Sequence, residues 1–308
     1  MSKDWKNSLL SSGIPLEQSL RQTLINLGIT SVSEYAYERL NEEGINKIFS
    51  IDNYGKYYPI FKGEHNQRLC VEYFIEAKYA DDNKNWSFTP EEFPKSLTLQ
   101  EIYIVLDSLV EELKLKQINV SKENQDSFCG NGLVIDNKSG DRYEIRRGIQ
   151  QLRYALVNRT LEVTKKQLFG LEDDRQVISV LVPILVTTAK LWRIETGLSI
   201  EDIKKSKDLP EVAKERDYLL LFEPPDNQMI RYSLSLVDEM IREELKGELT
   251  LLLKKIVPRL SNPDFTSYIE YFYTSMPRVF LVCNYNYFHQ TISNSTSFFQ
   301  HKNIFRNK

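Results

Sequence analysis

The segments FSIDNYG (residues 49–55) and CVEYFIEAKYADDNKNW (residues 70–86) decide the fold of this chain. The second segment opens with apolar and aromatic residues, which predict a buried strand, and it then runs into a charged loop. Side chains two residues apart lie on the same face of a strand, so we expect Glu76 and Lys78 side by side. An ordinary surface ion pair and half of a metal site are the two interpretations of this acid and lysine.

Asp52 favours the metal site. It lies at the end of the strand that precedes the Glu76 strand in the sequence. If the two strands pair antiparallel, Asp52 and Glu76 converge, and two close carboxylates repel each other unless a positive charge lies between them. Mg²⁺ prefers oxygen ligands from one or two carboxylates together with phosphate. Lys78 would then orient a water molecule for attack on phosphorus while the metal stabilises the developing charge.

Glu17 is a third candidate acid. Leu16, Leu20, Leu24 and Leu27 recur at helical spacing and predict an amphipathic helix over residues 15–27, with Glu17 in its first turn. Glu17 could reach over the same face as Asp52 and hold a second cation or a water molecule. The alternative is that it only stabilises the helix N-terminus.

Three short motifs together resemble the PD-(D/E)XK restriction-endonuclease-like superfamily: SGIPLE (residues 12–17), FSIDNYG (residues 49–55) and FIEAKY (residues 74–79). The resemblance covers about residues 11 to 190. It implies a core of a helix, three strands, a helix and a strand. One departure is Ile51, which stands where the motif has proline.

The resemblance also implies a role for each residue of the motifs. Asp52, Glu76 and the backbone carbonyl of Ala77 are expected to bind the metal, Lys78 to orient the nucleophilic water, and Glu17 to be the acid of the helix. The implied cofactor is Mg²⁺, with Mn²⁺ as a substitute.

The long helix expected over residues 142–167 provides candidate substrate contacts. Gln150 and Tyr154 form a Q-x-x-x-Y pattern that is similar to one in exonuclease-like branches of the superfamily. With Arg146 and Arg153 they recur at helical spacing, so one face of the helix could present these side chains to a phosphate backbone. A solvated arginine face, with Tyr154 in the core, is the alternative.

The remaining pattern predicts an α/β fold with a mixed central sheet. We expect a hairpin of strands over residues 33–40 and 45–55, a helix over 99–115 capped by Thr98 and Glu101, and a loop or small hairpin over 119–141. A buried strand is expected from Val177, then a short helix and a strand over 208–225, a helix over 234–256, a last strand over 277–288, and a polar, frayed tail from Asn294. Residues 1–195 are expected to form the nuclease-like core, and residues 196–308 a C-terminal α/β elaboration packed on the same domain.

Composition sets limits on function. The chain has 308 residues and a net charge of −3, so any nucleic-acid binding requires a local basic surface. Its three cysteines form no CxxC pattern, which favours a reducing cytoplasm over a disulfide framework. The most apolar run, residues 177–189, is too short to cross a bilayer, and we expect no membrane association.

The leading hypothesis is a Mg²⁺-dependent nuclease that hydrolyses phosphodiester bonds, with DNA as the expected substrate, in restriction, phage defence or DNA processing. The first alternative is a catalytically silent nuclease-fold subunit for binding or assembly. A second alternative is a nuclease active only within a larger complex. A homodimer and a larger defence or processing complex are both compatible with the sequence.

Overall fold

One large mixed sheet organises the molecule. The computed structural model describes residues 4–40, 44–59, 68–81, 83–92, 97–98, 104–106, 117–118, 126–136, 140–169, 177–243 and 277–301. Twelve strands form the main sheet: β1 (Thr30–Val32), β4 (Asn53–Tyr57), β5 (Arg68–Lys78), β6 (Asn85–Pro90), β8 (Ile104–Leu106), β10 (Phe128–Ile135), β11 (Gly140–Asp141), β12 (Val177–Thr187), β13 (Lys190–Ile194), β14 (Ala213–Arg216), β15 (Tyr218–Phe222) and β16 (Val279–Asn284). The α/β class and the mixed sheet are therefore confirmed.

Strands from both halves of the chain alternate within this sheet. The hydrogen-bonded order is β1-β4-β5-β12-β16-β15-β10-β6-β13-β14, with β8 paired to β12 and β11 to β10. The late strands β15 and β16 lie between β12 and β10. One sheet therefore contains strands from both sides of residue 195, the predicted end of the core. The strands that begin near Val177, Tyr218 and Arg278 therefore all belong to one sheet.

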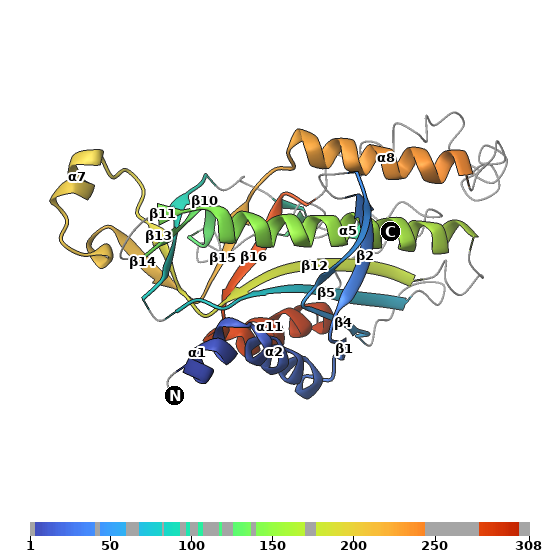
Figure 1. The fold of residues 1–308 in the computed structure, drawn as a ribbon, viewed down its shortest axis with the longest axis horizontal. Coiled ribbons are helices and arrows are strands. Elements are labelled where there is room, and N and C mark those ends of the chain that lie inside the picture. Colours follow the sequence, from blue (N-terminus) through green and yellow to red (C-terminus); the bar gives the residue numbers. More distant parts are fainter. Residues whose placement is uncertain are drawn as a thin grey trace.

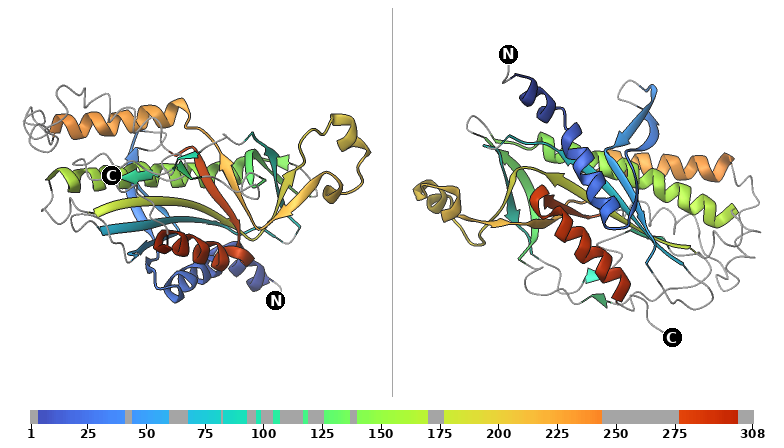
Figure 2. Two further views of the ribbon diagram at one scale, coloured as in Figure 1. Left: turned by 180° about the vertical axis from the view of Figure 1, so that it is seen from behind. Right: turned by 90° about the horizontal axis from the view of Figure 1, so that it is seen from below.

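Helices cover both faces of the sheet (Figure 1). The described helices are α1 (Asp4–Ser11), α2 (Ile14–Asn26), α5 (Tyr143–Phe169), α7 (Ile200–Lys205), α8 (Asn227–Glu243) and α11 (Phe288–His301), with short 3-10 turns η2 (Leu209–Glu211) and η3 (Tyr285–Tyr287). The long helix α5 crosses one face, with α8 stacked on it, whereas α1, α2 and α11 lie on the opposite face (Figures 1 and 2). The α7 segment projects from the β13–β14 end of the sheet.

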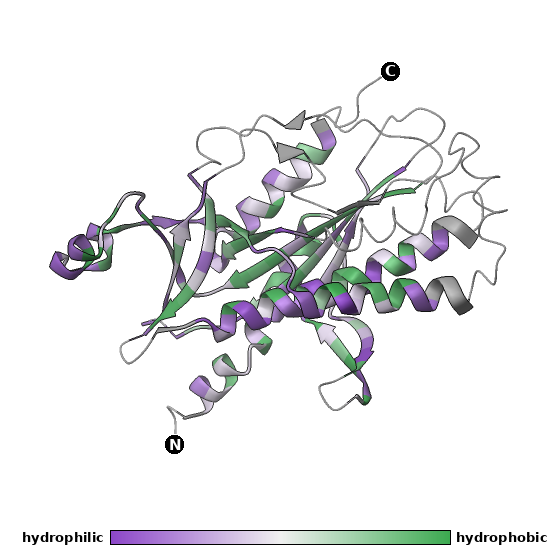
Figure 3. Ribbon diagram, turned by 90° about the horizontal axis from the view of Figure 1, so that it is seen from above, coloured by the Kyte–Doolittle hydropathy of each residue, from purple (hydrophilic) through white to green (hydrophobic). Residues whose placement is uncertain are grey.

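Strand β5 separates two hydrophobic cores. Phe74 packs in the core under α5, whereas Val71, Tyr73 and Ile75 pack against α2 and α11. This alternation follows from the two-residue period of a strand, and it puts Glu72, Glu76 and Lys78 on the α5 face. The central strands are correspondingly hydrophobic along most of their length (Figure 3). The expected side-by-side placement of Glu76 and Lys78 is confirmed.

The hairpin predicted after the first helix exists, but it leaves the main sheet. Strands β2 (Tyr35–Leu40) and β3 (Asn46–Ile51) form a separate two-stranded sheet among the described strands and lie against α5. The predicted single strand over 45–55 is wrong, because the chain bends at Asp52 and continues as β4 in the main sheet. The bend takes Asp52 out of the regular strand pairing on both sides.

The helix predicted over residues 99–115 is also wrong in its described part. Ile104–Leu106 is strand β8, antiparallel to β12, and Thr98 belongs to the short strand β7 (Leu97–Thr98), which pairs with β9 (Gln117–Ile118). The β-branched residues of this segment suit a strand, and pairing with β12 outweighs the helical spacing of the apolar residues. The rest of the predicted helix, Glu101 included, lies outside the described residues.

Two boundaries differ from the prediction near the C-terminus. The frayed tail predicted from Asn294 is wrong for residues 294–301, because they belong to α11, whose Phe288, Ile292 and Phe299 are buried against the sheet. Residues 302–308 lie outside the described part. Helix α8 begins at Asn227, seven residues before the predicted start at Leu234, and residues 244–256 lie outside the described part. The predicted small hairpin over 119–141 corresponds to β10 and β11, and the short helix and strand over 208–225 to η2, β14 and β15.

Within the described ranges, none of the helices combines the length and the apolar composition needed to cross a bilayer.

Candidate active site

Asp52 lies opposite the C-terminal end of β5. Strands β4 and β5 pair antiparallel, with Asn53 opposite Ile75, so Asp52 comes next to Glu76 and Ala77. The carboxylate Oδ2 of Asp52 accepts a hydrogen bond from the backbone N–H of Ala77 at 2.7 Å. This bond fixes the acid at the point where the hairpin ends and the main sheet begins.

Glu76 and Lys78 form the second part of the site. Lys78 Nζ donates to Glu76 Oε1, and it also donates to Oε1 of Gln151 on α5 at 3.1 Å. Glu76 is almost fully buried, with 1% of its surface exposed, whereas 19% of the Lys78 side chain is exposed. The acid and lysine are therefore not an ordinary surface ion pair, because one partner is buried and the pair is tied to a second element.

The surroundings of Glu76 disfavour its charge. Burial raises the pKa of Glu76 to about 8, and the neighbouring Asp52 adds to this effect, while Lys78 lowers the pKa. Its Oε2 atom is buried and has no hydrogen-bond partner in the described part of the chain. A buried carboxylate oxygen without a partner is costly unless a proton or a cation satisfies it.

More carboxylates gather around Asp52 than the sequence predicted. Burial raises the pKa of Asp52, the N–H of Ala77 and Lys78 lower it, and Glu34 raises it further. Glu17 follows the same pattern, because burial, Asp52 and Glu34 raise its pKa and Lys78 lowers it. Glu17 therefore interacts electrostatically with Asp52. Glu34, exposed between β1 and β2, was missed because no pairing or motif connects it to the site in the sequence.

The donor set fits a hard divalent cation. Among the described residues, no cluster of three or more His, Cys, Asp and Glu side chains is arranged to hold a metal ion. Mg²⁺ does not require three protein carboxylates, because it is commonly held by one or two of them together with waters and substrate phosphate. Asp52 and Glu76 provide two carboxylates, and the unpartnered Oε2 of Glu76 is the atom that a cation would satisfy.

Helix α5 contributes Gln151, which sequence reasoning missed. Its side chain accepts the bond from Lys78, and its backbone carbonyl accepts a bond from the Tyr37 hydroxyl of the hairpin at 3.3 Å. Three residues earlier, Gly148 lets α5 approach β5 and β12 closely. A Cβ at Gly148 would come 2.6 Å from Leu185 Cδ1 and 3.5 Å from Lys78 Cε. The rotation of α5 over the sheet brings Gln151 to the site, and the helical pattern alone does not determine that rotation.

The four predicted substrate contacts on α5 do not form one exposed face. Arg146 and Gln150 are exposed, whereas Arg153 and Tyr154 are buried, with 3% and 8% of their surfaces accessible. Arg153 donates to the backbone oxygen of Glu223, and Tyr154 packs edge-to-face on Tyr232 with 4.9 Å between ring centroids. The prediction of a shared exposed face is wrong for these two residues, because Arg153 bonds to Glu223 just after β15 and Tyr154 packs under α8.

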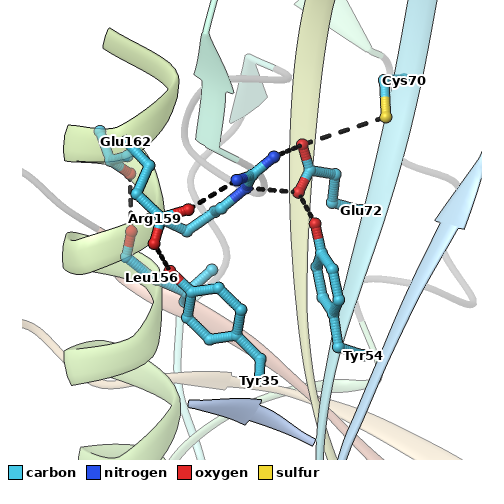
Figure 4. Close-up of polar contacts among 8 residues, drawn as sticks. Tyr35, Tyr54, Cys70, Glu72, Leu156, Arg159 and Glu162 are labelled. Atoms are coloured by element: carbon cyan, nitrogen blue, oxygen red, sulfur yellow. Dashed lines mark hydrogen bonds and ion pairs between the residues drawn. The ribbon is translucent and has the colours of Figure 1, made fainter. Parts of the chain in front are cut away.

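A buried ion pair fixes α5 on β5 next to the site (Figure 4). Arg159 donates to both carboxylate oxygens of Glu72, at 2.7 Å from Nε and 3.1 Å from Nη2. The Tyr54 hydroxyl donates to the same carboxylate, and Glu162 accepts from both Arg159 and the Tyr35 hydroxyl. Glu72 lies four residues before Glu76 on the same strand face, so this network connects β4, β5 and the hairpin to the helix that contacts Lys78.

No protein-family model matches this sequence, and neither a curated protein nor a solved structure is significantly similar to it.

Proposed function

We propose that this protein is a metal-dependent nuclease that hydrolyses phosphodiester bonds, with Asp52, Glu76 and Lys78 as its catalytic centre. We further propose that its core is restriction-endonuclease-like, of the PD-(D/E)XK type, and that DNA is its substrate. A cytoplasmic location and a role in restriction, phage defence or DNA processing, as a homodimer or within a larger complex, belong to the same proposal.

One observation supports this proposal above all others. Two carboxylates and a lysine, from the bend before β4 and from the end of β5, meet beside the parallel strand β12. Ligands of α/β sheets bind at the carboxyl ends of parallel strands. The buried Glu76 with its unpartnered Oε2 is unfavourable for folding alone, and a site with a positively charged ligand would explain its presence.

Each residue then has a distinct role. Asp52 and Glu76 would hold Mg²⁺, which supplies stabilisation of the negative charge that develops on the phosphate oxygens. The ammonium group of Lys78, held by Gln151, orients the attacking water beside the scissile phosphate. Glu17, within electrostatic reach of Asp52, adds negative charge at the same end of the site. The carbonyl of Ala77 is a further proposed metal ligand.

The silent binding subunit has one observation in its favour. Lys78 already bonds to Glu76 Oε1, and the lysine charge offsets part of the cost of burying the acid without any metal. In that arrangement the site would be an internal ion pair at the end of β5. Metal binding distinguishes the two functions, because only the nuclease requires it.

The deciding experiment is cleavage of linear, circular and single-stranded DNA, and of RNA, with Mg²⁺ or Mn²⁺. Wild type is compared with Asp52→Ala and Lys78→Ala. Glu215→Gln is the control, because Glu215 is half exposed and pairs with Lys190 on the surface. The proposal expects metal-dependent cleavage by wild type and by the control, and a loss of roughly 100-fold or more in both site variants.

The outcomes separate the candidate functions. Cleavage of circular DNA would identify an endonuclease, and cleavage of linear DNA alone an exonuclease. If wild type binds metal through Asp52 but cuts nothing, a partner protein or another nucleic acid is required. If wild type neither cuts nor binds metal, the binding subunit is the correct function.

A further inference from the structure

The contact between Gln151 and Lys78 defines which side of α5 faces the site. The amide oxygen of Gln151 lies 3.1 Å from Lys78 Nζ. Gly148, three residues earlier, lies on the same side, because a Cβ there would come 3.5 Å from Lys78 Cε. Residues three and four apart are neighbours on a helix surface, so the next side chain on this flank toward the N-terminus is Arg147.

Arg146 and Arg147 consequently point in different directions. Successive residues of an α-helix are rotated by about 100°, so Arg147 lies about 40° from Gln151 around the helix axis and Arg146 about 140°. Arg153, which lies two turns beyond Arg146, turns toward Glu223 and away from the site. The sequence pattern predicted substrate contacts on the side of α5 that carries Arg146. The Gln151 contact instead favours the side that carries Arg147.

Arg147 is exposed and its charge is uncompensated within the described part of the chain. The structure gives its guanidinium no hydrogen bond and no ion pair there. Besides Lys78, a second cation bound to α5 is Lys84, which pairs with Glu144 at 2.9 Å and also interacts electrostatically with Asp81 and Asp136. Lys84 is therefore neutralised by its own neighbours, and Arg147 is not.

The acids around Asp52 disfavour one direction of approach by a polyanion. Glu17 and Glu34 interact with Asp52 and repel phosphate on the side of α2 and β1. Helix α5 lies on the other face of β5, where Gly148 packs against Lys78 and Arg147 precedes it in the chain. A nucleic-acid backbone that places one phosphate at the metal ligands would keep its next phosphates on the α5 side.

We infer that Arg147 contacts a backbone phosphate of the substrate next to the scissile phosphate, and that this flank of α5 is the nucleic-acid surface of the protein. The inference rests on the proposed nuclease function and adds the side from which the substrate binds. A planar guanidinium matches two phosphate oxygens, so an arginine suits this contact better than a lysine.

Salt dependence of binding tests the inference. Full-length wild type, Arg147→Ala, Arg147→Lys and Arg146→Ala are titrated with a fluorescent duplex and the matching single strand at several KCl concentrations, in EDTA so that no metal-dependent cleavage occurs. Each phosphate contact contributes about 0.9 to the slope of log affinity against log salt for a duplex and about 0.7 for a single strand. We expect Arg147→Ala to lower the slope by about one contact and to weaken binding several-fold, with a smaller effect in Arg146→Ala. Arg147→Lys retains most of the slope, because it retains the charge.

A distant control and the cleavage assay make every outcome decisive. Lys205→Ala on the projecting α7 segment is exposed and is expected to match wild type. If wild type binds and cleaves but Arg147→Ala has the wild-type slope, the Arg147 contact is wrong and the nuclease proposal stands. If Arg146→Ala lowers the salt slope and the affinity as much as Arg147→Ala does, the assignment of the substrate to the Arg147 side is overturned. If wild type neither binds nor cleaves any nucleic acid, the proposed function fails and the contact fails with it.

Discussion

Lys78 Nζ lies 3.1 Å from Oε1 of Gln151, although 73 residues separate the two in sequence. Gln151 thus orients an ammonium group whose other partner is the buried carboxylate of Glu76. The Tyr37 hydroxyl bonds to the backbone of the same glutamine, so the hairpin that ends at Asp52 is fixed to the same point of α5. The position of α5 therefore determines the geometry of both the lysine and the acid.

Removal of the Gln151 side-chain oxygen should impair turnover more than substrate binding. In Gln151→Leu, Lys78 would keep its contact with Glu76 and lose the one with residue 151. We expect kcat to fall by roughly 10-fold or more with little change in KM. The measurement is steady-state cleavage with Mg²⁺. Gln228→Leu, the same change on the exposed surface of α8, is the control. An unchanged kcat in Gln151→Leu would show that the lysine does not need this contact.

The raised pKa of Glu76 predicts that stability without metal falls as the pH rises. An acid with a folded pKa of about 8 and an unfolded pKa of 4.5 binds its proton more tightly in the folded state. Its contribution to stability is therefore present at low pH and is lost between about pH 4.5 and about pH 8. Glu76→Gln should remove this dependence and, at pH 8 in EDTA, raise the free energy of unfolding by roughly 2–4 kcal/mol relative to wild type. Urea unfolding at pH 5 and pH 8 measures the difference, and an equal pH dependence in both proteins would contradict the assignment to Glu76.

Metal binding should stabilise the fold through the two acids. A ligand that binds only the folded state at 100 times its Kd adds about 2.7 kcal/mol to the free energy of unfolding. We expect Mg²⁺ to raise the Tm of wild type by several degrees, and EDTA to reverse this. Asp52→Asn should abolish the shift, whereas Glu215→Gln should retain it. A shift that persists in Asp52→Asn would place the metal elsewhere.

The convergence of Asp52, Glu76 and Lys78 could be predicted because it depends on local rules. The two-residue period of a strand places Glu76 beside Lys78, and an antiparallel neighbour brings Asp52 opposite them. The helix over residues 15–27 was predicted for the same reason, since its leucines repeat at helical spacing and Gly28, with a φ of 75°, ends it in the left-handed region.

The rest of the site depends on tertiary packing that the sequence pattern does not encode. Gln150 and Gln151 are adjacent, and only the rotation of α5 over β5 determines that Gln151 contacts Lys78. Likewise, the burial of Tyr154 depends on α8, which lies far later in the sequence and covers that side of α5. The strand at Ile104–Leu106 was mistaken for helix because its partner, β12, is equally distant in sequence.

The Glu72–Arg159 pair should be the most sensitive contact between β5 and α5. Arg159 is 7% exposed and Glu72 1% exposed, so removal of either partner leaves a charge in a site with little access to water. Arg159→Met is expected to lower the free energy of unfolding by roughly 3–5 kcal/mol.

The double variant Glu72→Gln with Arg159→Met tests whether the unpaired charge is the cause. The neutral amide that replaces the Glu72 carboxylate can still accept from the Tyr54 hydroxyl, so the double variant should recover much of the loss. Urea unfolding at pH 7 measures all three proteins, with Lys204→Met as the control, because its pair with Glu201 is exposed and is expected to contribute less than about 1 kcal/mol. Equal destabilisation in the single and the double variant would mean that packing by the Arg159 stem, and not its charge, holds α5 on the sheet.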